Sequence, residues 1–368
     1  MHKVLRSFYL CLIILFSLVS CGEFTTKDKD VDTGNLSEVH IFLSQEKLQR
    51  LYSSVATDSY TACTFDKGKW HGDADIKVRG FSSRMYPKKS FALKIDGRKY
   101  MLERGQENGG LYNRIAMRAY QLAGVSACDT ESVALFINDE YLGCYNFITF
   151  YDPDVMDGEL YKCYFFYITD MGMNHPLISE TEKKFPKDGD MSNMEYLIYA
   201  CSSLSDADWR KFVNKNVDIE KTAAYFAVHD FLTVIDTKRT NYYIQYDGRY
   251  RIIPWDNEKC LLEGKERAKY SLGGSNQLMC RLATVPEVKE SYNQKMQALF
   301  TGGGGDTCIL DQLREEAVAM FDNLATAMES DPEYGIPRQE FMKMKNYVLN
   351  YLDKDTGRAA DGDKLILH

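Results

Sequence analysis

The 368-residue sequence lacks several patterns by which metalloproteins and hydrolases are often recognised. No two cysteines form a Cys-x-x-Cys pair and none has a histidine at zinc-ligand spacing, which disfavours a structural zinc site. No Gly-x-Ser-x-Gly elbow and no Walker loop is present, so the serine hydrolase and P-loop signatures are both missing. Eight cysteines follow residue 21. We interpret most of them as small buried hydrophobic residues and leave their pairing open.

Long apolar runs are also scarce, and the one clear run lies at residues 8–19. His2, Lys3 and Arg6 precede it, and it is too short to span a bilayer comfortably, which is typical of a signal peptide. Residues 18–20 then lead directly into Cys21, where lipoprotein processing would acylate the thiol. We therefore expect a signal peptide at residues 1–20, a lipidated Cys21, and export to the cell envelope. The expected place is the outer membrane, on its periplasmic or cell-surface side.

Basic residues are outnumbered, with 45 Lys and Arg against 53 Asp and Glu and a formal net charge of −8. Phosphate backbones require a basic surface, so this balance argues against a nucleic acid partner. Residues 21–38 are polar and charged and predict a flexible tether that cannot bury a core. The remaining residues, 39–365, are enough for one large domain, and a monomer is expected.

The front of this domain favours strands and the back favours helices. Alternating polar and apolar residues predict strands at 75–79, 91–95, 132–137 and 141–150, with a helix at 112–122. Helical spacing predicts helices at 194–204, 219–233, 288–300, 309–330 and 337–352, and Asp247-Gly248 predicts a hairpin within 241–253. Without a repeated strand-helix-strand pattern, this order predicts an α+β fold. We expect a strand-rich lobe at about 39–165 and a helix-rich lobe at about 190–355, with a cleft between them.

One segment has a spacing that suggests phosphoryl transfer. Asp236 is followed after four residues by Asn241, then by the hairpin and by Asp256. Protein kinases use this order because the first aspartate faces the attacking hydroxyl, while the asparagine and the later aspartate bind one magnesium ion. The spacing alone also occurs in ordinary solvated loops.

Several separated segments resemble the CotH (spore-coat protein H-like) family of atypical protein kinases. The front end resembles it in Val78-Arg79-Gly80-Phe81-Ser82-Ser83-Arg84 and Lys88-Lys89-Ser90-Phe91-Ala92-Leu93-Lys94. The hairpin Asn138-Asp139-Glu140-Tyr141-Leu142-Gly143 and the segment Gly158-Glu159-Leu160-Tyr161-Lys162 are similar to the family's next two motifs. Residues 236–246 and Pro254-Trp255-Asp256 resemble its core. Together these segments span about residues 39–350.

This resemblance implies a two-lobed atypical protein-kinase-like fold that uses Mg2+ and ATP. It implies transfer of the γ-phosphate to a hydroxyl of a protein or small acceptor, with the membrane reached through the lipid anchor only. Asp236 would orient or deprotonate the acceptor hydroxyl, and Lys238 would contact the transferred phosphate. Cofactor contacts are implied for Arg79, Lys89, Lys94 and Trp255, and metal binding for Asn241, Asp256 and Glu258. For Lys89 and Lys94 a solvated strand position is an equal alternative, and Trp255 is equally suited to core packing.

The chain also departs from the family pattern in ways that leave a second interpretation open. Glu258 stands where the family has an aspartate, Thr149 where it has a glutamate, and Gln121 where a lysine-pairing glutamate is wanted. Weakened metal and lysine partners are what a pseudokinase would show. The alternative function is therefore a catalytically weak pseudokinase that serves as a lipid-anchored binding module at the surface or in the periplasm.

Overall fold

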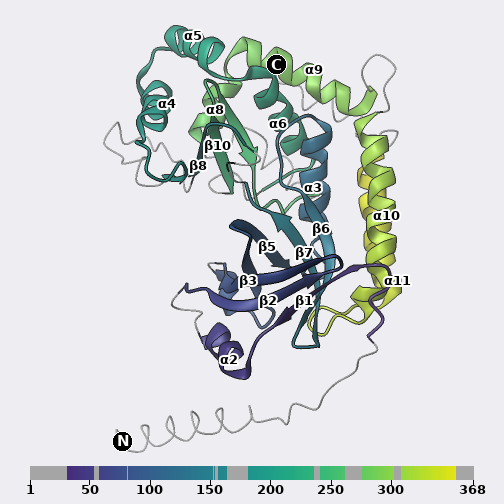
Figure 1. The fold of residues 1–368 in the computed structure, drawn as a ribbon. Coiled ribbons are helices and arrows are strands. Elements are labelled where there is room, and N and C mark those ends of the chain that lie inside the picture. The colour runs from purple at the N-terminus through teal and green to yellow at the C-terminus, as the bar shows by residue number, and fades with distance from the viewer. Residues whose placement is uncertain are drawn as a thin grey trace, which may run out of the picture. The chain divides into compact units, whose positions relative to one another are not determined.

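The computed structural model describes residues 31–53, 58–80, 82–151, 153, 156–163, 181–235, 241–261, 276–301 and 308–353. Within them the chain is a mixture of helices and strands, as the α+β prediction requires (Figure 1). Two sheets carry the strands, a closed barrel and a separate four-stranded sheet. No helix in these ranges is both long and apolar enough to cross a membrane.

The barrel contains the first seven strands in the order β1-β2-β3-β4-β5-β7-β6. Their bounds are β1 Ser37–Phe42, β2 Thr61–Lys67, β3 Trp70–Arg79, β4 Ser90–Ile95, β5 Arg98–Arg104, β6 Thr130–Ile137 and β7 Glu140–Thr149. Neighbouring strands are antiparallel except for β1 and β6, which close the barrel as a parallel pair. The predicted strands at 75–79, 91–95, 132–137 and 141–150 all lie in this barrel, and β1 begins two residues before the expected start of the domain.

Strand alternation decides which barrel side chains face the rest of the molecule. Ile76, Val78, Phe91, Leu93 and Leu102 fill the barrel interior. Because successive side chains point to opposite faces, Arg79 on β3 and Met101 and Glu103 on β5 point out of the barrel. This outer face meets the second sheet, where Met101 and Ile148 join Tyr243, Ile253 and Trp255 in a small apolar cluster.

The second sheet has the order β11-β10-β8-β9 and is antiparallel throughout. Its strands are β8 Glu159–Cys163, β9 Thr181–Phe185, β10 Tyr242–Tyr246 and β11 Tyr250–Pro254. The predicted hairpin is present as β10 and β11, and Gly248 adopts a φ of 101° in its turn. A positive φ suits glycine because it has no Cβ to clash with the backbone.

Most of the helices pack around the second sheet and form the largest core, whereas the first helix packs against β2 and β3 of the barrel. They are α2 Gln45–Ser53, α3 Leu111–Leu122, α4 Ser192–Ser203, α5 Asp206–Asn216, α6 Ile219–Phe231, α8 Gln277–Ala283, α9 Pro286–Thr301, α10 Ile309–Glu329 and α11 Arg338–Tyr351, with a short 3-10 turn η2 at Ser82–Met85. A side chain caps the start of α6, because Asp218 Oδ1 accepts a hydrogen bond from the Lys221 amide at 3.1 Å. α6 is buried along most of its length, while α10 lies beside α3 (Figure 1).

Candidate active site

Three carboxylates from two distant parts of the chain meet outside the barrel. Glu103 comes from β5, and Asp256 and Glu258 follow β11. One oxygen from each of the three lies within 4.8 Å of the others. Carboxylate oxygens are the ligands that Mg2+ prefers, so the cluster is chemically suited to a hard divalent cation. Metal binding was predicted for Asp256 and Glu258, and the structure adds Glu103 to the same cluster.

Glu103 is held rigidly by two asparagines. Its Oε2 accepts hydrogen bonds from Asn113 Nδ2 of α3 at 2.9 Å and from Asn146 Nδ2 of β7 at 3.1 Å. Only 8% of Glu103 is exposed. Burial, and then the negative charges of Asp256 and Glu258, raise the pKa of Glu103 to about 8. At neutral pH this carboxylate therefore requires a proton or a cation beside it.

Asn113 of α3 and Gln106, which follows β5, also bind residues 256–258, which we call the metal-binding loop because they carry two of the three clustered carboxylates. The backbone N–H of Asn257 donates to Asn113 Oδ1 at 3.0 Å, and Gln106 Nε2 donates to Glu258 Oε2 at 2.9 Å. The Asn257 side chain is fully buried, and among the described residues neither its Oδ1 nor its Nδ2 has a hydrogen-bond partner. Asn146 Oδ1 is also buried without a partner there. Buried polar atoms are normally satisfied, so these orphaned atoms beside the cluster fit a site that binds a hydrated cation.

Asn241 lies at the same end of the β10–β11 hairpin as Asp256. Tyr242 pairs with Pro254, so the preceding Asn241 and the following Asp256 both emerge where the two strands end. Both residues have positive φ values, 64° for Asn241 and 55° for Asp256. Asn and Asp tolerate this left-handed region better than other side chains, and such conformations cluster at functional sites.

Arg79 and Trp255 lie together at the junction of the barrel and the second sheet. The Arg79 guanidinium lies 5.0 Å from the Phe150 ring centroid and 5.7 Å from that of Trp255. Trp255 is only 3% exposed and its ring stacks on Phe150 at 5.0 Å. Core packing, the alternative weighed for Trp255, is thus what the structure shows, and Arg79 is held in place by aromatic rings.

A second basic side chain, Lys162 of β8, faces the same region. Lys162 pairs with Tyr243 across the sheet. Its pKa is lowered to about 8, first by burial and then by the positive charges of Arg79 and Lys184, while the charge of Asp256 opposes the shift. Lys162 is therefore close enough to interact with both Arg79 and the metal-binding loop. The resemblance included this lysine in a motif but assigned it no role.

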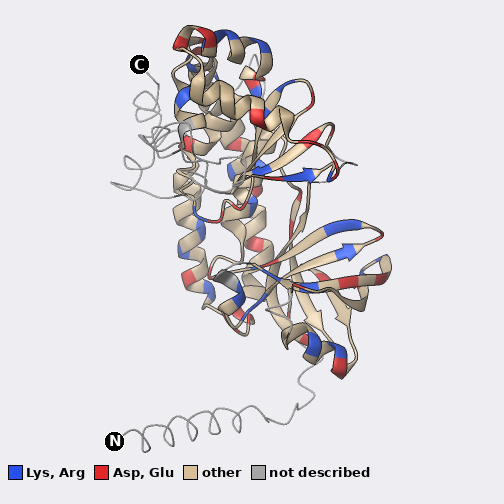
Figure 2. Cartoon of the chain, turned by 90° about the vertical axis from the view of Figure 1, so that its left-hand side faces the viewer, with Lys and Arg blue, Asp and Glu red and all other residues tan. Residues whose placement is uncertain are grey.

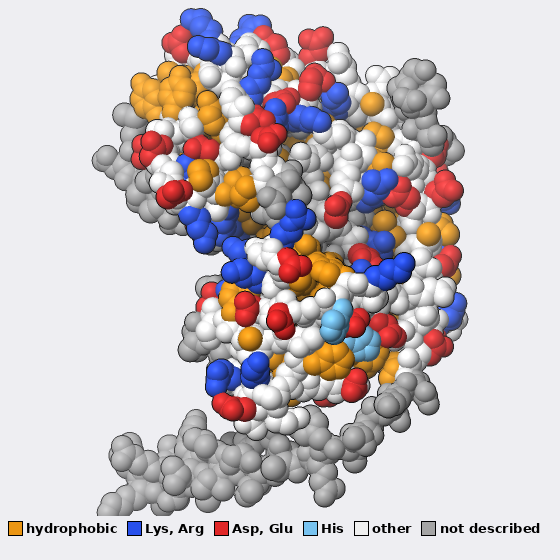
Figure 3. Space-filling view, in the orientation of Figure 1, with side chains coloured by type: hydrophobic (Ala, Val, Ile, Leu, Met, Phe, Trp, Pro, Cys, Tyr) orange, Lys and Arg blue, Asp and Glu red, His pale blue; other side chains and the backbone are white. Residues whose placement is uncertain are grey.

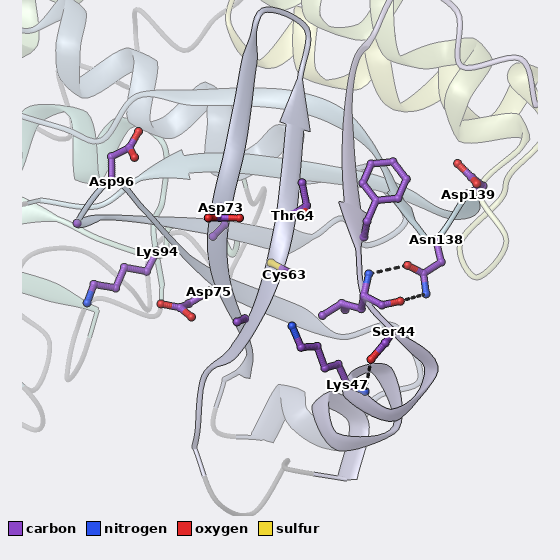
Figure 4. Close-up of a pocket in the computed structure, with 15 residues that line it drawn as sticks. Ser44, Lys47, Cys63, Thr64, Asp73, Asp75, Lys94, Asp96, Asn138 and Asp139 are labelled. Carbon is purple, nitrogen blue, oxygen red and sulfur yellow. Dashed lines mark hydrogen bonds between the residues drawn. The ribbon is translucent and has the colours of Figure 1, made fainter.

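The structure does not bring Lys89 or Lys94 into the carboxylate cluster. Lys89 donates from Nζ to the Arg84 carbonyl at 2.7 Å. Lys94 points out of the barrel like Glu103, but it lies near the tip of the β4–β5 hairpin and is exposed. It lines an open pocket of about 950 Å³. Figure 4 shows Asp75 and Asp96 near it in this pocket.

Other predicted site residues lie outside the cluster or outside the described ranges. Gln121, near the end of α3, donates from Nε2 to Asp129 Oδ1 just before β6, at 2.9 Å. The Thr149 amide donates to the Asp129 carbonyl at 3.1 Å. Cys21, Asp236 and Lys238 lie outside the residues that the structure describes.

Sequence reasoning missed the residues that support the metal-binding loop. Glu103, Asn113 and Asn146 are separated by up to 43 positions and share no motif spacing. The available signal was a polar residue in the middle of a largely apolar strand, such as Asn146 in β7. Such a residue needs a partner when buried, but the pattern does not say which one.

Comparison with known proteins identifies the family. The family model described as CotH kinase protein matches residues 76–354, and the chain belongs to this family. A similar protein is the inner spore coat protein H of Bacillus subtilis, 20% identical over 356 residues, which cover 86% of this chain and 95% of that protein. A kinase-like function at the level of the family is thereby supported.

Two solved structures also match this chain remotely. One is the proinflammatory kinase CtkA of Helicobacter pylori, 12% identical, covering 76% of this chain and 95% of that chain with a TM-score of 0.32. The other is HipA from a Shewanella oneidensis toxin-antitoxin complex, 11% identical, covering 94% of this chain and 76% of that chain with a TM-score of 0.34. Similarities this remote carry no argument about function.

Proposed function

We propose that this chain is an extracytoplasmic kinase that transfers the γ-phosphate of Mg-ATP to a hydroxyl of a protein or other acceptor. In this proposal the barrel is the N-lobe of a two-lobed kinase-like fold, and the second sheet with its helices is the C-lobe. The observation that carries the proposal is the placement of Glu103, Asp256 and Glu258 within 4.8 Å of one another beside Lys162 and Arg79. Acidic metal ligands opposite basic side chains are what a metal-bound polyphosphate needs.

Each side chain has a defined task in this proposal. Asp256 and Glu258, with Glu103 and Asn241, would hold Mg2+, which when bound neutralises charge on the phosphates. Lys162 and Arg79 would bind the phosphate oxygens, and the rings of Phe150 and Trp255 keep the Arg79 guanidinium oriented. Asp236 would accept or orient the proton of the acceptor hydroxyl, and Lys238 would contact the transferred phosphate.

A radiolabelled phosphate assay tests this function. With γ-labelled ATP and Mg2+, the wild type is expected to label itself or an added protein acceptor, and Asp256→Ala to lose nearly all incorporation. Glu290→Ala is the matched control, because Glu290 is exposed on α9. Equal incorporation by the wild type and Asp256→Ala would argue against the proposal.

The second candidate is a catalytically weak pseudokinase that acts as a lipid-anchored binding module. It is favoured by one observation: Gln121 stands where a lysine-pairing glutamate is wanted, and its uncharged side chain donates to Asp129 Oδ1 at 2.9 Å. Thermal unfolding with Mg-ATP separates the two candidates from a bare scaffold, since a ligand that binds only the folded state raises the melting temperature. A shift without phosphate incorporation would identify the pseudokinase.

We also propose that Cys21 anchors the protein to the cell envelope. Support comes only from the apolar run at residues 8–19 and the cysteine that follows it. Metabolic labelling with palmitate is expected to mark the wild type and not Cys21→Ser. Equal labelling of both proteins would contradict the anchor.

A further inference from the structure

A group of lysines lies next to the proposed phosphate site, on the outer face of the barrel, on β9 and in the turn after β9. We call it the lysine rim, and its members are Lys77, Lys94, Lys99, Lys184 and Lys187. Lys77, Lys94 and Lys99 point out of the barrel on the same face as Arg79 and Glu103, because they alternate with the interior residues of β3, β4 and β5. The rim therefore continues the face that carries the candidate active site.

Two of these lysines face each other directly. Lys94 of β4 and Lys99 of β5 are cross-strand partners, and both are exposed. Like charges opposite each other destabilise a sheet. In a chain with more acidic than basic residues, such a pair indicates a surface that meets an anion from outside.

The other four members of the rim all act on the charge of Lys99. The pKa of Lys99 is lowered, by partial burial first and then by Lys187, Lys184, Lys77 and Lys94. Lys184 also contributes to the lowered pKa of Lys162, so it connects the rim to the proposed phosphate site. Figure 3 shows Lys and Arg side chains gathered where the surface is hollowed between its upper and lower parts, and Figure 2 shows basic positions on strands of both sheets.

Part of this charge is already neutralised and part is not. Lys77 pairs with Asp58 at 2.9 Å, and Lys184 with Glu182 at 2.5 Å. Asp75 lies across from Lys94 on β3, but no ion pair joins them. Lys94, Lys99 and Lys187 have no ion-pair partner in the described part of the chain and are all exposed. Three available positive charges therefore remain at the edge of the site.

We propose that the lysine rim binds the acceptor, and that this acceptor is a protein segment carrying acidic residues beside the hydroxyl to be phosphorylated. The proposal rests on the kinase function proposed above and specifies its substrate class. An extended acidic peptide fits better than a compact anion because the charges come from four strands and the turn after β9 and follow the outer face away from the metal-binding loop. The rim is thus a specificity surface and not part of the metal site.

Peptide binding tests the rim without requiring catalysis. The probes are a fluorescent peptide of one serine flanked by glutamates and an otherwise identical peptide flanked by lysines. The acidic peptide is expected to bind the wild type with a salt-sensitive Kd, and Lys94→Glu/Lys99→Glu to weaken this binding about tenfold. Lys69→Glu/Lys215→Glu makes the same charge change at exposed positions away from the rim and is expected to change Kd less than twofold.

A stability measurement separates a loss of peptide binding from a loss of folding. Lys99→Glu places opposite charges across from each other, so its melting temperature should equal or exceed that of the wild type while acidic-peptide binding falls. Equal affinity for acidic and basic peptides, or unchanged binding by Lys94→Glu/Lys99→Glu, would overturn the proposal. Displacement of the peptide by anionic vesicles or RNA at lower concentration than by unlabelled peptide would also overturn it. Asp256→Ala should still bind the peptide, so loss of phosphate transfer in that variant leaves the rim separately testable.

Discussion

Glu103 gives the sharpest prediction, because its environment makes it costly to ionise without a cation. Burial and the neighbouring carboxylates raise its pKa from 4.5 to about 8. Below pH 4.5 the carboxyl is protonated in both the folded and unfolded states, so Glu103 does not change the free energy of unfolding there. As the pH rises toward 8 the unfolded chain releases this proton first, so the free energy of unfolding falls.

The magnitude follows from the shift. One pKa unit corresponds to about 1.4 kcal/mol, so the full penalty approaches about 5 kcal/mol above pH 8 and is about 3 kcal/mol at pH 7. Glu103→Gln keeps an oxygen that accepts from Asn113 and Asn146 but removes the charge. In EDTA at pH 7 this variant is expected to be more stable than the wild type by up to about 3 kcal/mol.

Magnesium should remove most of the difference in stability between the two proteins. At a hundredfold excess over its Kd, a ligand that binds only the folded state stabilises it by about 2.7 kcal/mol. The free energy of unfolding of the wild type should rise by this amount. It should also no longer depend on pH between pH 5 and 8, because the cation replaces the proton on Glu103. Glu103→Gln should gain much less.

Urea unfolding at pH 5, 6, 7 and 8, with EDTA or Mg2+, measures all of these quantities. Glu107→Gln is the control, since Glu107 is exposed and lies three positions after the last residue of β5. The reasoning would be refuted if Glu103→Gln were less stable than the wild type in EDTA, or if both gained equally from Mg2+.

Two further predictions concern other buried charges. Lys88 Nζ pairs with Asp331 at 2.5 Å, and the two side chains are 2% and 0% exposed. Lys88→Met should therefore lower the free energy of unfolding by about 3–5 kcal/mol in urea, because Asp331 would be left as an unpaired buried charge; a loss under about 1 kcal/mol would contradict this. Lys162→Met should raise the KM for ATP at least tenfold in the phosphate assay without lowering the melting temperature in EDTA, since it removes a partly buried charge. An unchanged KM would exclude Lys162 from phosphate binding.

Much of the fold was predictable because its signals are local. The strands of the barrel alternate, α6 begins at a capping aspartate, and the β10–β11 hairpin turns at Asp247-Gly248. Helix α5 and strands β8 and β9 were not predicted, because short segments take their structure from tertiary packing as much as from their own pattern. The closed barrel was also not predicted, since the parallel pairing of β1 with β6 joins residues about a hundred positions apart.

The candidate site was predictable only where it follows a motif. Asp256 and Glu258 were predicted as metal ligands, and the structure places them together. Glu103 was not predicted, because it reaches the cluster through the register of β5 with β7 and through Asn113 of α3. The family resemblance implied a cofactor contact for Lys94, and the register of β4 with β5 places this residue near the tip of their hairpin, in the lysine rim.

The most direct test of the central claim is a crystal structure of the protein soaked with ADP and Mn2+, with data collected to detect manganese by anomalous scattering. The account predicts one peak or more within coordination distance of oxygens of Glu103, Asp256 and Glu258, with the phosphates toward Lys162. Absence of any peak at these carboxylates at a Mn2+ concentration that fills them in solution, or a nucleotide bound elsewhere, would contradict it.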